Sequence, residues 1–364
     1  MTELNITSEP DWVSAPGESI LDRLEELGWT QKELAGRLGY TTKHVSQLVN
    51  GKAPITEDTA LRLERVLGGT AQFWLEREAQ YREAIARKAA LDELETQKFW
   101  LKELPLSEMV RLGWIRRFSH KGQQVAACMN FFGVATVEAW RARYAERGAA
   151  FRASPSYAKN AASVGAWLRQ TERRAAAVEC SPFDKTAFKE MLYEARALTS
   201  EEAPESFVPK LVESCRKSGV ALVFEPTPKG CPLSGAARWV SPDKALIALS
   251  LRHKSNDHLW FSFFHEAGHL ALHSKKLEFV DLEGRLDDEH EDEANAFARD
   301  HLIPPDSFAK LTSQTLSEQA IRHFAAEVGV APGIVVGRLQ KEGRIKWSQH
   351  NRLKVRYRWA DEAG

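Results

Sequence analysis

The segment FFHEAGHLALH, which covers residues 263–273, places three histidines at intervals of four residues. If the segment is a helix, His265 and His269 lie on one face, because four residues advance about 40° beyond a full turn. Two such imidazoles can bind one zinc ion, and Glu266 can take a proton from water. We expect His273, one turn further on, to support a ligand or to pack in the core. A helix without metal is the alternative, because this match also occurs by chance.

A catalytic zinc site needs a third protein ligand, and the segment EHEDEANAFARDHLIP at residues 289–304 offers one. If Ala294 and Ala298 pack toward the core, Glu291 shares their face of the helix. Glu293 lies about 200° away from Glu291 around the helix axis. We therefore expect Glu291, and not Glu293, to bind the metal and to leave one position open for water.

Three short apolar segments precede the helix of the first motif: GVALVFEP, SGAARWV and KALIALSL, within residues 219–251. They are rich in β-branched and aromatic residues and are separated by turn residues, which is typical of strands. We expect a small sheet beside the helix, with an edge that could hold a substrate segment as an added strand. Because helical spacing dominates elsewhere, the predicted fold is mostly α with a small β-sheet (α+β).

The stretch TQKELAGRLGYTTKHVSQLVNGKAPIT contains two short helical patterns joined by a turn. Thr30 with Glu33 predicts a capping box that opens the first helix, and Gly39 ends it. Thr41 or Thr42 then caps the second helix. Two short helices joined in this way predict a helix-turn-helix, in which the second helix lies in the major groove of DNA.

The expected DNA contacts come from both helices and the turn that follows them. The residues expected to meet base edges begin the second helix: Thr42, Lys43, His44, Ser46 and Gln47. Gln31, Lys32 and Lys52 are better placed for phosphates. Residues 17–67 hold seven Lys/Arg and eight Asp/Glu, so this region is not globally basic. A small helical packing module that binds no DNA is therefore the alternative.

Composition narrows the class of protein further. A length of 364 residues suggests two or three domains, and a net charge of zero means that any DNA binding needs a local basic patch. No apolar run approaches the ~18 residues of a membrane span. The four cysteines lie far apart, at Cys128, Cys180, Cys215 and Cys231. We therefore expect a protein of the reducing cytoplasm that does not bind membranes.

Changes of pattern along the chain suggest five segments. These are a polar leader (1–16), a helix-turn-helix domain (17–81), a helical middle region (82–204), a zinc peptidase-like domain (205–345) and a basic C-terminal segment (346–364). In the last, NRLKVRYRW alternates apolar and basic residues, which predicts a strand over residues 351–359. We favour a solvated edge strand. A second nucleic-acid surface, with Tyr357 or Trp359 as a stacking plane, is the alternative.

Residues 16–81 resemble the Xre-type helix-turn-helix of HigA-like addiction-module antitoxins. The resemblance rests on the PGE opening, the TQKELA helix, the NGKAPIT turn, the TALRLERVLG helix and the FWL end. It covers about the first fifth of the chain. It implies a dimer that binds operator DNA, and it does not imply that a toxin exists.

Residues 205–345 resemble the ImmA/IrrE metallopeptidase family in four segments: LSGAARWVSPDKALIALSLR, LWFSFFHEAGHLALH, EDEANAFARDHLIP and IRHFAAEVGVAPGIVVGRLQKEGRI. By position, the resemblance implies that His265, His269 and Glu291 bind zinc and that Glu266 is the general base. Members of the family cleave a transcriptional repressor under stress. Fusion of the peptidase to a DNA-binding domain is typical of the family.

These patterns predict a cytoplasmic, DNA-binding transcriptional regulator with a zinc-dependent endopeptidase domain of the HExxH type. The expected cofactor is Zn²⁺, and the expected partners are operator DNA, a second copy of the chain and a protein substrate such as a repressor or antitoxin. The setting would be a stress, toxin–antitoxin or phage-defence response. In one alternative the zinc domain senses or binds a partner without proteolysis, and in another the protein is an antitoxin that neutralises a toxin by contact.

Overall fold

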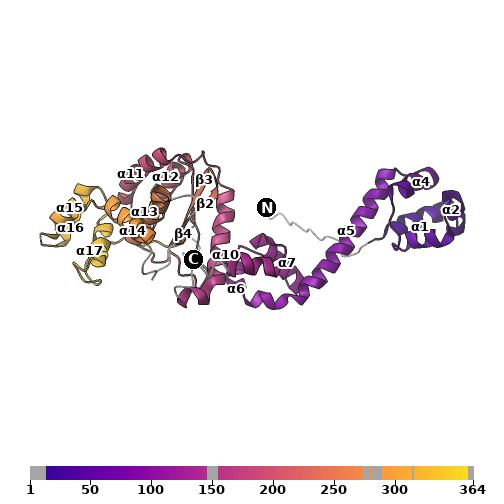
Figure 1. Ribbon diagram of the computed structural model, residues 1–364, viewed down its shortest axis with the longest axis horizontal. Coiled ribbons are helices and arrows are strands. Elements are labelled where there is room, and N and C mark those ends of the chain that lie inside the picture. The colour runs from indigo at the N-terminus through magenta and orange to yellow at the C-terminus, as the bar shows by residue number, and fades with distance from the viewer. Residues whose placement is uncertain (1–13, 146–154, 274–278, 281–288, 314, 360–364) are drawn as a thin grey trace, which may run out of the picture. The chain divides into compact units, whose positions relative to one another are not determined.

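The computed structural model describes residues 14–145, 155–273, 279–280, 289–313 and 315–359 (Figure 1). The chain divides into two compact units, Met1–Lys98 with His120–Ala126, and Phe99–Ser119 with Ala127–Gly364. Of the predicted leader, residues 1–13 lie outside the described residues. The predicted α+β fold is confirmed, because helices dominate both units and one small sheet lies in the second.

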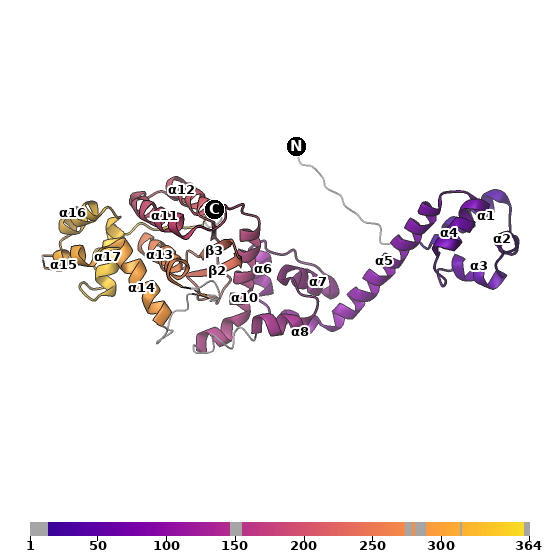
Figure 2. The same ribbon diagram turned by 45° about the horizontal axis from the view of Figure 1, so that its top comes forward.

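The first unit is built on five helices: α1 (Pro16–Leu27), α2 (Gln31–Leu38), α3 (Thr42–Val49), α4 (Glu57–Leu67) and α5 (Ala71–Thr96). Their apolar stripes enclose one core, in which Ile20, Leu34, Val45, Leu63 and Trp74 are almost fully buried. Figure 2 shows α1 to α4 clustered together, with α5 leaving the cluster. Helices of this length are marginal alone, so packing of the apolar stripes stabilises them.

The starts of α2 and α3 form as the sequence predicts, with one difference. The hydroxyl oxygens of Thr30 and Thr41 accept hydrogen bonds at 3.2 Å from the N–H groups of Glu33 and His44. Each cap satisfies a backbone donor that has no partner within the helix. The predicted capping box is incomplete, because the Glu33 carboxylate accepts from Arg37 at 2.9 Å instead of returning to the cap.

The remaining helical segments are η1 (Lys98–Lys102), α6 (Leu106–Arg111), α7 (Lys121–Phe132), α8 (Val137–Trp140), η2 (Arg141–Ala145), α10 (Pro155–Ala176), α11 (Lys185–Ala197), η3 (Leu198–Ser200), α12 (Pro204–Lys217), α13 (Asn256–Leu272), α14 (Glu289–Leu302), α15 (Pro305–Thr312), α16 (Glu318–Val328), α17 (Pro332–Lys341) and η4 (Asn351–Leu353). The helix predicted to hold the HExxH motif is α13, and the helix predicted to hold the third ligand is α14.

The sheet contains β1 (Val220–Phe224), β2 (Gly235–Ser241), β3 (Lys244–Leu249) and β4 (Phe279–Val280), in the order β1-β3-β2-β4. Strand β1 runs parallel to β3, and β2 runs antiparallel to β3 with Gly235 opposite Leu249. The three predicted strands are thus confirmed. The sequence did not predict β4, which pairs with β2 at Ala236 and Ala237, so that edge of β2 is already partly occupied.

Helices cover both faces of the sheet. In both views α10 lies on one side of the strands, and α12 and α13 lie on the other (Figures 1 and 2). Strands covered on both faces carry continuous apolar runs, which is what β1 and β3 show. The core on the α13 side joins Leu222 and Ile247 of the sheet to Trp260 of α13 and Phe207 of α12. This packing fixes α13 against β2.

The strand predicted for residues 351–359 is wrong. Helix η4 replaces its first part, and the only pairing among the described residues there is a single bridge between Ser255 and Arg356. Two apolar residues of the alternating pattern, Leu353 and Tyr357, are buried in the same core as α13. Because Tyr357 is buried, its ring cannot stack on a nucleic-acid base.

The Lys354 side chain is buried, whereas the solvated edge strand favoured for this segment would leave its basic residues exposed. Its ammonium is 2.7 Å from the Asp257 carboxylate, and the two side chains are 8% and 7% exposed. Beside this pair, Asn256 N–H donates to the Val355 carbonyl at 3.0 Å, and Val355 N–H donates to Asn256 Oδ1 at 3.2 Å. The C-terminal segment is therefore attached to the first turn of α13 by one ion pair and two hydrogen bonds.

Within the described ranges, no single helix is long and apolar enough to cross a membrane. The pair α16 and α17 meets the requirements of length and composition only when the two helices are joined across a bend of 111°.

Candidate functional site

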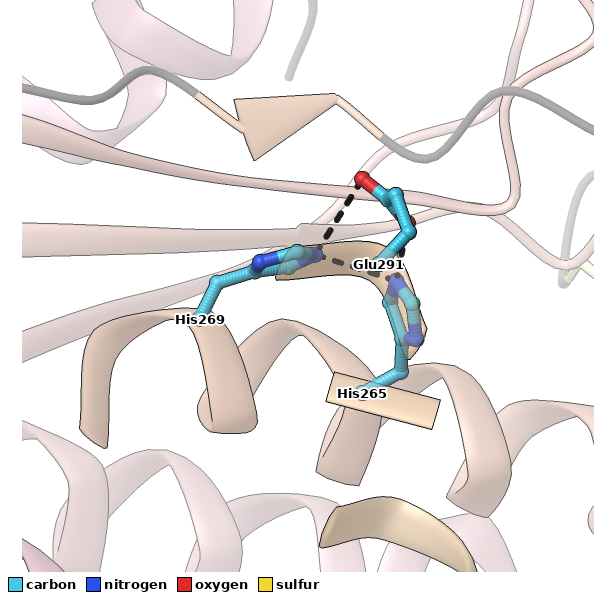
Figure 3. Close-up of side chains that lie close together, drawn as sticks. All are labelled: His265, His269 and Glu291. Carbon is cyan, nitrogen blue, oxygen red and sulfur yellow. Dashed lines mark hydrogen bonds and ion pairs between the residues drawn. The ribbon is translucent and has the colours of Figure 1, made fainter. Parts of the chain in front are cut away.

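Helix α13 presents two imidazoles to one point. His265 and His269 are 3% and 1% exposed, and their Nε2 atoms lie 3.1 Å apart (Figure 3). The i,i+4 spacing of an α-helix places them one above the other, as the sequence predicts. The opposite side of the helix carries Trp260, Phe263 and Phe264, all fully buried. Packing of this aromatic side against the core holds the two histidines in place.

Helix α14 brings the third donor. Glu291 Oε2 lies 3.2 Å from His265 Nε2, and Glu291 Oε1 lies 3.5 Å from His269 Nε2 (Figure 3). The two helices approach closely, because a Cβ added at Gly268 would lie 3.3 Å from the Cα of Ala294. This close approach lets a glutamate on α14 reach histidines on α13.

The three donors fit a zinc ion. One atom from each residue lies within 4.8 Å of the others, at a buried point. Two Zn–N bonds of about 2.05 Å that span the imidazole separation would meet at about 100°, near the tetrahedral angle. Burial raises the pKa of Glu291, but hydrogen bonds to His265 and His269 outweigh it and lower the pKa to about 2. Burial lowers the pKa of His269, which favours the neutral imidazole that a metal needs.

Residues around the donors orient them. His265 Nδ1 lies 3.1 Å from Asn295 Oδ1, so an Nδ1–H can donate there and leave Nε2 for a metal. His269 Nδ1 lies 3.2 Å from His273 Nδ1, and His273 Nε2 lies 2.8 Å from Glu293 Oε2. The supporting role expected for His273 thus has a geometric basis. Sequence reasoning missed Asn295, although it follows Glu291 by four residues on the same helix face.

Glu266 is fully buried beneath the sheet. A Cβ added at Gly235, the first residue of β2, would lie 2.5 Å from Glu266 Oε1. Any side chain at Gly235 would therefore occupy the space that the carboxylate uses. The requirement for glycine cannot be seen in the sequence, because it arises from contact between a strand and a helix that are distant along the chain.

A cleft of about 710 Å³ runs beside the three donors and is bordered by α13, α14 and α17. His265 and Glu291 line it together with Phe261, Ile334 and Trp347. The combination of a metal-type donor set with a mixed apolar and polar cleft is suited to a peptide segment.

Glu291→Gln is expected to lower retention of zinc by the purified protein, because an amide oxygen carries no charge to bind the ion. Glu293→Gln is the matched control. It removes the same charge two residues further along α14, on a side chain that is 52% exposed. Metal content after dialysis can be measured by atomic emission. If only the Glu293 variant loses metal, Glu293 and not Glu291 is the third ligand.

The residues predicted to contact DNA lie mainly on α3. Thr42 and Lys43 are exposed, as are Lys32 and Lys52, whereas Gln31, His44, Ser46 and Gln47 are half-buried. His44 packs edge-on against the Tyr40 ring at 4.7 Å, and Ser46 Oγ accepts from Asn50 Nδ2 at 3.3 Å. Lys43 and Gln47, four residues apart, share one side of the helix. They are the stronger candidates for reading bases.

Gln47→Ala is expected to change the preferred DNA sequence, because one bidentate base contact is worth about 1–3 kcal/mol of discrimination. Lys52→Ala should lower the affinity for all sequences alike. Selection of binding sites from random duplexes, followed by titration of selected and scrambled DNA, measures both effects. Lys88→Ala, an exposed lysine on α5, is the control. Equal loss on both duplexes for Gln47→Ala would exclude it from base readout.

Comparisons with known families match both units. Residues 20–74 match the helix-turn-helix family, and residues 215–340 match a peptidase family, M78, described as the IrrE N-terminal-like domain. The two resemblances inferred from the sequence are therefore confirmed. The first match covers α3 and the second covers the sheet, α13 and α14.

Three relatives share the helix-turn-helix region. The HTH-type transcriptional regulator YddM of Escherichia coli (strain K12) is 33% identical over 20% of this chain and 78% of its own length. Virulence-associated protein I of Dichelobacter nodosus is 37% identical over 18% of this chain and 62% of its own length. Antitoxin HigA-1 of Vibrio cholerae is 40% identical over 16% of this chain and 56% of its own length. The chain thus spans less than two thirds of the last two relatives.

One solved structure is similar to the same region. It is a candidate antidote protein of a plasmid maintenance system from Nostoc punctiforme, 30% identical over 23% of this chain and 91% of that chain, with a TM-score of 0.22. These four similarities concern only the N-terminal part of the sequence.

Proposed function

This chain belongs to the helix-turn-helix transcriptional regulators, and we propose that it combines operator binding with zinc-dependent cleavage of a protein partner. The observation that carries the proposal is the convergence of His265, His269 and Glu291 beside the buried Glu266. Two histidines and a glutamate with an adjacent carboxylate form the donor set of known zinc peptidases. The match to a peptidase family supports the same reading.

The chain's own residues supply the chemistry around the ion. Zn²⁺ held by these ligands would lower the pKa of a water molecule and polarise the scissile carbonyl. Glu266 takes the proton from that water and delivers it to the leaving amine. Asn295 and His273 orient the two imidazoles, and Gly235 leaves room for the Glu266 carboxylate. Burial of the site strengthens each electrostatic interaction within it.

The DNA-binding unit would act as a dimer on an inverted repeat, with half-sites about one helical turn apart. Lys43 and Gln47 would read bases, and Lys32 and Lys52 would contact phosphates. Operator binding would require the protein to share the cytoplasm with the DNA. Cleavage of a repressor or antitoxin would then couple transcription to stress, to a toxin–antitoxin pair or to phage defence.

The alternative in which the zinc domain only senses or binds a partner predicts that Glu266 is dispensable. An antitoxin role is supported by the name of one relative, Antitoxin HigA-1, but its similarity ends within the DNA-binding region. A short toxin-like reading frame beside the gene would support that role.

Quantitative proteomics of cells that express the wild type or Glu266→Gln is the direct test. A protein fragment that accumulates with the wild type and is absent with the variant would identify the substrate. Glu190→Gln, which changes an exposed glutamate on α11 outside the site, should give the wild-type pattern. Identical fragment patterns in all three strains would favour the non-proteolytic alternative.

A further inference from the structure

Trp347 is the most unusual side chain of the cleft. It is 61% exposed, and it lines the same cleft as His265 and Glu291. Tryptophan carries a large apolar area, which a folding chain normally buries. Exposed tryptophans beside a pocket are typical anchors for a binding partner.

The backbone of Trp347 is held firmly despite the exposure of its ring. Its carbonyl accepts a hydrogen bond from Asn351 Nδ2 at 2.8 Å, and Gln340 Nε2 lies 3.2 Å from the same oxygen. Gln340 is 2% exposed, and its Nε2 also lies 2.9 Å from the Gln349 carbonyl. A buried amide therefore fixes the turn that presents the indole, which lowers the entropy lost when a partner binds.

The same buried amide connects this turn to the helix of the metal site. Gln340 Oε1 accepts from Lys354 Nζ at 2.7 Å, and Lys354 pairs with Asp257 at 2.7 Å. Asp257 belongs to the first turn of α13. The position of Trp347 is thus fixed relative to the helix that carries the two histidines.

The charges near Trp347 that lack a partner are mostly positive. Lys341 lines the cleft, and Arg344 and Lys346 precede Trp347 by three residues and one residue; all three are exposed and have no ion-pair partner within the described ranges. Of the acids in the cleft, Asp257 is paired with Lys354, and Glu342 is paired with Arg338. The turn therefore carries an exposed aromatic side chain and exposed cations within six residues of each other along the chain.

We propose that Trp347, with Lys341 and Lys346, forms a docking subsite for a substrate segment that carries a large apolar side chain between carboxylates. This inference rests on the proposed peptidase function of the same cleft. The indole contacts the apolar side chain, and the cations pair with the flanking carboxylates.

The test measures binding by zinc-loaded Glu266→Gln protein, so that it does not depend on turnover. The probes are a fluorescent peptide with Leu-Phe between runs of Asp and Glu, the same peptide with Lys and Arg as the flanking residues, and a fluorescent deoxythymidine oligomer. We expect the acidic peptide to bind most tightly. Trp347→Ala should weaken that binding by about tenfold or more, and Lys341→Glu should weaken it and reduce its dependence on salt.

Two matched controls separate the subsite from general surface effects. Phe99→Ala removes an aromatic side chain that is 66% exposed outside the cleft, and Lys189→Glu reverses an exposed charge on α11. Both should leave the affinity unchanged, and all variants should retain zinc. Equal binding of the two peptides, absence of binding, an unchanged Kd for Trp347→Ala, or preference for the oligomer would each overturn the proposal. If cleavage is never found but the acidic peptide binds through Trp347, the peptidase function fails and the docking subsite stands.

Discussion

Glu266→Gln is expected to lower the rate of substrate cleavage by about 10²–10⁴-fold, the usual contribution of a general acid–base group. Glutamine has nearly the same shape as glutamate and so fits the space above Gly235. It cannot accept the proton from water. Because Glu266 lies outside the three-residue donor set, zinc content should stay near that of the wild type.

The measurement is a single-turnover assay on the substrate that proteomics identifies, with metal content and operator affinity determined on the same preparation. Glu190→Gln, which changes an exposed glutamate on α11, should cleave at the wild-type rate. A Glu266 variant that loses both zinc and activity would assign the residue a structural role at the metal site. Full activity in the variant would exclude it as the base.

Lys354→Met is expected to destabilise the second unit by about 3–5 kcal/mol, because it leaves the buried Asp257 carboxylate without its cation. The two groups are nearly inaccessible to water, so solvent cannot replace the lost partner. The effect should be concentrated at the first turn of α13, where the C-terminal segment is attached. Hydrogen exchange of the α13 amides measures this local loss of stability.

Arg358→Met provides the control, because Arg358 is exposed on the same segment and such surface changes usually stay within about 0.5 kcal/mol. Combining Lys354→Met with Asp257→Leu should recover much of the lost stability, because no unpaired charge remains. Equal protection of α13 in Lys354→Met and Arg358→Met would show that the pair contributes little.

Helical periodicity accounts for the parts of the site that could be predicted. The spacing of His265 and His269 needs only the geometry of one helix. The choice of Glu291 over Glu293 needs only the further assumption that Ala294 faces the core, and Ala294 is fully buried. The threonine caps of α2 and α3 were predictable for the same reason, since each joins residues three apart.

Contacts between distant segments account for what could not be predicted. Asn295 and Gly235 acquire their roles only when α14 and β2 pack against α13. The alternation at residues 351–359 favoured a strand, yet no neighbouring strand is present there among the described residues to form a ladder, and one bridge to Ser255 forms instead.

The sequence by itself determined the two kinds of domain and the candidate donors on α13 and α14, because each depends on residues close together along the chain. Only the tertiary structure decided that the Lys354 side chain is buried and that Trp347 is exposed beside the candidate metal site. Lys354 is buried because its ammonium pairs with the carboxylate of Asp257, which lies on a helix about 100 residues away in sequence. The same packing uses Gln340 to hold the turn that keeps the indole in the cleft.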